Sequence, residues 1–94
     1  MKIAEIYAIL DEIAPFADAE NWDNSGLQIG TMQSEFDQIY VALDVDSDMI
    51  LNIAPNSLLI THHPLIFGGL KSLNFAKFPA NIVRNLVQKN ISLI

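Results

Sequence analysis

The chain has 94 residues, of which 51% are hydrophobic, and its net charge of −6 comes from 11 acidic and 5 basic residues. This length allows one domain with a modest core, and the acidic balance argues against nucleic acid as a partner. The absence of cysteine excludes disulfides and thiolate metal sites, and no apolar run reaches the roughly 18 residues of a membrane span, so we expect a cytoplasmic protein that does not contact a membrane.

The first half of the chain predicts a helix, an irregular segment and a strand. Apolar residues recur at helical spacing over residues 2–13, and Pro15 ends that pattern. Residues 18–34 have no period and many turn formers, so we expect a loop that Trp22 anchors in apolar surroundings. Residues 39–43 form a short apolar run of strand-forming residues.

The second half alternates helices with strands. We expect helices over residues 47–53 and 79–89, and strands over 58–61 and 91–94. This alternation predicts an α/β fold, in which βαβ units form a mainly parallel sheet flanked by helices. Because the last predicted strand reaches the final residue without a closing turn, we expect residues 1–94 to be the N-terminal part of one larger α/β domain.

The only two histidines of the chain, His62 and His63, are adjacent and lie between a predicted strand and Pro64. Side chains alternate along a strand, so the two imidazoles converge only if the backbone leaves strand geometry, which the proline favours. The pair therefore lies at the carboxyl end of a strand, where open α/β sheets bind ligands. Two interpretations stay open: the imidazoles bind metal, or they form a partly buried pair hydrogen-bonded to backbone carbonyls.

A catalytic metal site needs at least three protein ligands, so two histidines require carboxylate partners. The carboxylate placed best is Asp44, because it follows the strand predicted over residues 39–43. Helix capping or a local turn around the side chain explains Asp44 equally well.

The segment WDNSGLQIG, residues 22–30, also has two interpretations. It could line a pocket, with Asp23 and Asn24 presenting polar atoms to it. It could instead be a tight turn, in which Asn24 and Ser25 bond their own backbone and Gly26 takes a positive φ. We favour the turn for the glycine and leave both interpretations open for Asp23 and Asn24.

An N-terminal helix, WDNSGLQIG, VALDVD and LLITHHPLIF follow one another along nearly the whole chain. In this order and spacing the chain resembles the start of the Nif-three-like family, whose members are often called type 2 GTP cyclohydrolase I or dinuclear metal-binding proteins. The resemblance implies considerably longer proteins that assemble as toroidal homohexamers. It also implies a dinuclear metal centre in a cleft between domains.

By position, His62 and His63 match the paired metal ligands of that family, and Asp23 and Asn24 match residues that shape the site. The resemblance implies two divalent metal ions per full-length chain. It does not decide whether these ions are Zn, Fe, Mn or Ni. It places the remaining ligands beyond the end of this chain. It also implies a nucleotide or phosphorylated small molecule as substrate.

Three functional hypotheses follow. The first is a metal-dependent hydrolase whose dinuclear centre activates water, of the GTP cyclohydrolase type. The second is a metal-binding scaffold or regulatory protein without catalysis. The third is a complete small α/β adaptor, in which the histidine pair is an incidental turn.

Overall fold

A three-stranded parallel sheet forms the centre of the computed structural model, which describes residues 1–94. Its strands β1 (Gln38–Ala42), β2 (Ser57–Thr61) and β3 (Ser92–Leu93) lie side by side in sequence order. The central strand β2 contributes Leu58 and Leu59, which are fully buried because each faces one of the two covered sides of the sheet. The predicted α/β fold with a parallel sheet is confirmed.

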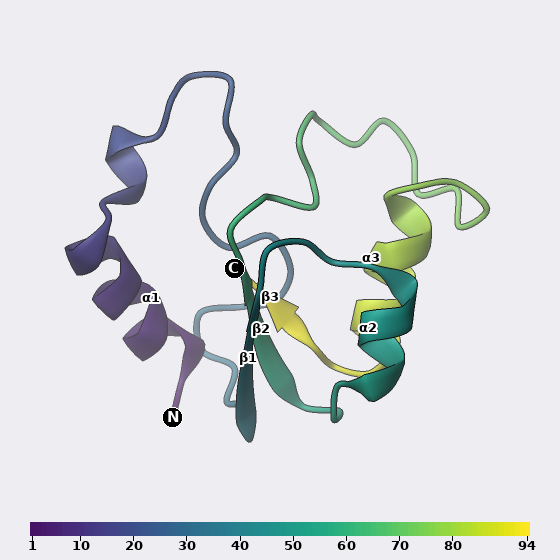
Figure 1. Ribbon diagram of the computed structural model, residues 1–94, viewed down its shortest axis with the longest axis horizontal. Coiled ribbons are helices and arrows are strands. Elements are labelled where there is room, and N and C mark those ends of the chain that lie inside the picture. Colours follow the sequence, from purple (N-terminus) through teal and green to yellow (C-terminus); the bar gives the residue numbers. More distant parts are fainter.

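Helices cover both faces of the sheet. Helix α1 (Ile3–Ile13), followed by the short 3-10 helix η1 (Phe16–Asp18), lies on one face. Helices α2 (Ser47–Asn52) and α3 (Ala80–Gln88) lie on the other, as Figure 1 shows. The loops that follow η1 and β2 extend beyond the same end of the sheet, the end at which the parallel strands finish (Figure 1).

The core has one apolar cluster on each face of the sheet. The cluster under α2 and α3 contains eight buried residues: Ile50, Ile53, Leu59, Leu65, Ile82, Leu86, Ile91 and Leu93. The cluster under α1 is smaller and centres on Ile3, Leu58 and Ile94. The side of β1 that faces the α1 layer is not covered, since Val41 is 77% exposed and Leu43 is 68% exposed.

Local sequence explains where the helices begin and end. The Asp46 carboxylate accepts a hydrogen bond from the Met49 amide at 2.7 Å and caps α2. Helix α1 ends two residues before Pro15, which cannot continue it. Asn90 takes a positive φ of 54° directly after the last turn of α3, as a helix-terminating asparagine does.

The predicted elements are all present, with ends that differ by one or two residues. The last strand is shorter than predicted, two residues instead of four, but an antiparallel bridge from Ile29 to Leu93 gives it a second neighbour. The prediction for Trp22 was wrong: its side chain is 67% exposed. No helix has both the length and the apolar character needed to cross a membrane.

Candidate metal centre

The two histidines lie at the carboxyl end of β2, where the backbone bends while it still pairs with the neighbouring strand. The His62 amide donates to the Ala42 carbonyl at 3.1 Å, and the His63 amide donates to the Leu43 carbonyl at 3.0 Å. These two bonds continue the β1–β2 pairing past the strands and fix the histidine backbone. The imidazole rings converge, with centroids 4.8 Å apart and planes inclined by 59°.

Asp44 contacts the second histidine. Its Oδ1 atom lies 2.9 Å from Nδ1 of His63, and both side chains are more than half exposed. The turn is held from the other side as well, because the Thr61 hydroxyl donates to the His63 carbonyl at 2.8 Å. The sequence placed Asp44 best as a carboxylate partner of the histidines, and in the structure its carboxylate contacts the His63 imidazole.

The donors present amount to part of a metal site. The His62 ring forms no hydrogen bond with the protein, and His63 uses only Nδ1, so each histidine keeps a ring nitrogen free. No three His, Asp or Glu side chains come together in a group that could hold a metal ion. Imidazole is a donor type that divalent cations take, and no third ligand joins the two histidines within residues 1–94.

The loop before the sheet, residues 22–28, combines both of the interpretations given to it. The Asp23 carboxylate accepts from the Asn24 amide at 2.8 Å, a local turn contact, and Gly26 has a φ of 117°. The Asn24 side-chain amide instead reaches across the molecule and donates to the Ile66 carbonyl. Asn24 therefore joins this loop to the segment that follows the histidines, while Asp23 stabilises the turn itself.

Gln28 is a second link between the same two segments, and it was not predicted from the sequence. Its Oε1 accepts from the Ile66 amide at 3.2 Å, and its Nε2 donates to the Asn24 carbonyl at 2.8 Å. Trp22 stacks on Phe67 next to these bonds, with centroids 6.2 Å apart. The only signal of this link in the sequence is that Gln28 is a polar residue in a turn-rich loop. That signal does not show that Ile66 is its hydrogen-bond partner.

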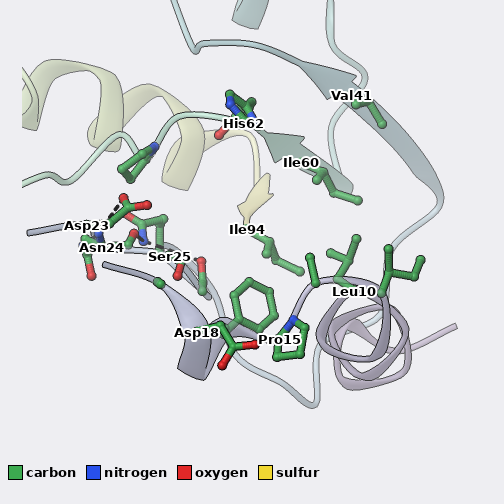
Figure 2. A pocket seen from close by; sticks show the side chains of 18 of the residues that line it. Leu10, Pro15, Asp18, Asp23, Asn24, Ser25, Val41, Ile60, His62 and Ile94 are labelled. Atoms are coloured by element: carbon green, nitrogen blue, oxygen red, sulfur yellow. Dashed lines mark hydrogen bonds between the residues drawn. The ribbon is translucent and has the colours of Figure 1, made fainter. Parts of the chain in front are cut away.

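An open pocket of about 1040 Å³ lies between the sheet and the α1–η1 layer, next to the first histidine. In Figure 2 the polar residues Asp23, Asn24, Ser25 and His62 lie towards one side of the pocket. The apolar residues Leu10, Val41, Ile60 and Ile94 lie towards the other (Figure 2). Asp23 and Asn24 are thus among the residues that line this pocket, which joins a polar rim to an apolar wall.

Comparison with known proteins agrees with this arrangement. The family model described as Duf34/NIF3 (NGG1p interacting factor 3) matches residues 1–94. The chain belongs to the Duf34/NIF3 family. The resemblance inferred from the WDN and HHP segments is thereby confirmed.

Curated relatives of the family carry a common name. A Campylobacter jejuni protein named GTP cyclohydrolase 1 type 2 homolog is 48% identical over 94 residues, which are the whole of this chain and 39% of that protein. A Helicobacter pylori protein named GTP cyclohydrolase 1 type 2 is 48% identical over 92 residues, 98% of this chain and 38% of that protein. This chain therefore spans about two-fifths of the length of these relatives.

Solved structures of the family share the fold. The Staphylococcus aureus protein SA1388 has a TM-score of 0.86 and 39% identity, over 100% of this chain and 27% of that one. Reduced HcgD from Methanocaldococcus jannaschii has a TM-score of 0.80 and 29% identity, over 99% of this chain and 38% of that one. The α/β fold of this chain is thus found in experimentally determined structures over nearly the whole of residues 1–94.

Proposed function

We propose that this chain contributes His62 and His63 to the dinuclear metal centre of a hydrolase of the GTP cyclohydrolase type. The observation that carries the proposal is the position of the two converging imidazoles at the carboxyl edge of the parallel sheet, beside an open pocket. The names of the relatives support the reaction class.

Each histidine would hold a cation through a ring nitrogen that the protein leaves free. Imidazole suits Zn, Fe and Ni and suits Mn less well, so the donor type does not choose one metal. The two ring planes are inclined by 59°, and in this proposal each imidazole binds its own cation of a neighbouring pair. The remaining ligands come, in this proposal, from the part of the longer relatives that this chain does not span.

Two divalent cations, when bound, supply an acidified water as nucleophile and neutralise charge that develops in the transition state. The chain itself would position the substrate. The pocket lining contains no lysine or arginine, so it suits the uncharged part of a nucleotide better than its phosphates. Leu10, Val41 and Ile60 offer an apolar wall for a flat base, and Asn24 stands at the polar rim.

The experiment compares bound metal in wild-type protein, made from its complete reading frame, with His62→Ala and His63→Ala. Gln88→Ala is the control, since Gln88 is exposed on α3 and its side chain forms no hydrogen bond. We expect either histidine substitution to lower bound metal sharply, and to lower the opening of the GTP purine ring in parallel. If both histidine variants bound as much metal as the wild type, the proposal would be refuted.

A second candidate function is a metal-binding scaffold that lacks catalysis. Uncovered apolar side chains at the sheet edge favour it, because Ile39 and Val41 on β1 and Leu43 directly after it are exposed, and the outer edge of β1 has no neighbouring strand. A homohexameric toroid, which the family resemblance implies, would be one way to cover this face and is compatible with either function. Assembly that survives removal of metal, with no turnover of nucleotides, would favour the scaffold. Under both candidate functions we propose that the protein is cytoplasmic.

A further inference from the structure

The contact between Asp44 and His63 is fixed by the sheet. Asp44 follows β1 by two residues, and His63 follows β2 by two. The hydrogen bond from the His63 amide to the Leu43 carbonyl holds the histidine next to the residue that precedes Asp44. The two side chains then meet at 2.9 Å across neighbouring strand ends. Any change in the β1–β2 register would separate them.

Stability alone does not account for this pair. The side chain of His63 is 57% exposed and that of Asp44 is 69% exposed. A pair this open to solvent contributes about 0–1 kcal/mol to folding. Its main physical consequence therefore lies in the state of the imidazole.

A neutral imidazole has one N–H donor and one lone-pair acceptor, and an ionised carboxylate only accepts. Asp44 at Nδ1 therefore selects the tautomer with the proton on Nδ1 and leaves the lone pair on Nε2. Metal-binding histidines commonly donate their second ring nitrogen to a carboxylate in this way, which fixes the ring and raises its basicity. His62 has no such partner, so the two histidines differ.

We infer that Asp44 is a positioning residue, which holds the His63 ring in the Nδ1–H tautomer and thereby makes Nε2 the atom that binds a divalent cation. The inference rests on the proposed metal site and adds a role within it. Asp44 contacts the ligand, not the cation. His63 is accordingly the more ordered of the two imidazoles before any cation binds.

The test uses protein from the complete reading frame, with Asp44→Ala, Asp44→Asn and the control Asp37→Asn. Asp37 lies just before β1, at the opposite end of the strand from Asp44, and its side chain has no hydrogen bond. The first readout is the ring ¹⁵N chemical shifts of His63 in metal-free protein, assigned with His63→Gln. The second is the affinity for Zn²⁺, measured by competition with a chelator.

We expect wild type and Asp37→Asn to show the Nδ1–H tautomer, and Asp44→Ala to lose it. The affinity for Zn²⁺ should fall by roughly 10–100-fold in Asp44→Ala, the usual effect of losing a carboxylate behind a ligand. Asp44→Asn should fall in between, because its carbonyl oxygen still accepts from Nδ1.

Three results would overturn the inference, and they are distinguishable. If wild type and all variants bound Zn²⁺ equally tightly, the role of Asp44 would be refuted and the proposed metal site would stand. An affinity in Asp44→Asn as low as in Asp44→Ala, with the Nδ1–H tautomer kept, would make Asp44 a direct ligand. Wild-type protein that binds no Zn²⁺ would remove the proposed function, and with it the role of Asp44.

Discussion

Replacement of Gln28 by alanine should loosen the loop that follows the histidines. Gln28 supplies the only acceptor for the Ile66 amide, at 3.2 Å, and its own amide donates to the Asn24 carbonyl at 2.8 Å. Each such bond contributes about 0.5–1.5 kcal/mol net, so losing both should cost about 2 kcal/mol of local stability. That cost corresponds to roughly 30-fold faster amide exchange where the loop opens.

Hydrogen–deuterium exchange, read by mass spectrometry on peptides that cover residues 22–28 and 64–67, measures this effect. Gln88→Ala is the matched control, because it removes the same side chain from an exposed position without hydrogen bonds. Exchange at residues 64–67 should rise in Gln28→Ala and stay at the wild-type rate in the control. Equal exchange in both variants would show that Gln28 does not hold the two loops together.

Three further substitutions test the fold that carries the site. Leu59→Ala, at a fully buried position of the central strand, should lower the free energy of unfolding in urea by about 2–5 kcal/mol. Asp46→Ala should cost about 1 kcal/mol and speed exchange of the Met49 amide, which Asp46 caps. Gly30→Ala should cost about 1–3 kcal/mol, because φ is +117° there and the new Cβ would lie 2.6 Å from the Ser92 hydroxyl oxygen. Melting curves that match wild type would refute the Gly30 prediction, and unchanged urea midpoints or exchange rates would refute the other two.

The fold was predictable because its information is local. Helices α1 and α3 have apolar residues at helical spacing, and β1 and β2 are short apolar runs bounded by breakers. The alternation of strands and helices then leaves few topologies other than a parallel sheet. The sequence also placed His62 and His63 correctly, since Pro64 marks the end of the strand and the bend that lets both rings converge.

The parts that the sequence did not predict depend on contacts between distant residues. Gln28 and Ile66 are 38 positions apart, and no spacing rule pairs a loop glutamine with a backbone amide. Trp22 was expected to anchor its loop in apolar surroundings, yet it stacks on Phe67 at an exposed loop surface. The contact between Asp44 and His63 needed the strand register, which the sequence alone leaves open.

The central claim is that His62 and His63 begin a dinuclear metal centre, and metal per chain tests it most directly. The measurement is elemental analysis by plasma mass spectrometry, on protein made from the complete reading frame and purified without chelator. We predict about two divalent metal ions per chain. A content near zero would contradict it, and would leave the histidine pair as a turn at the end of β2.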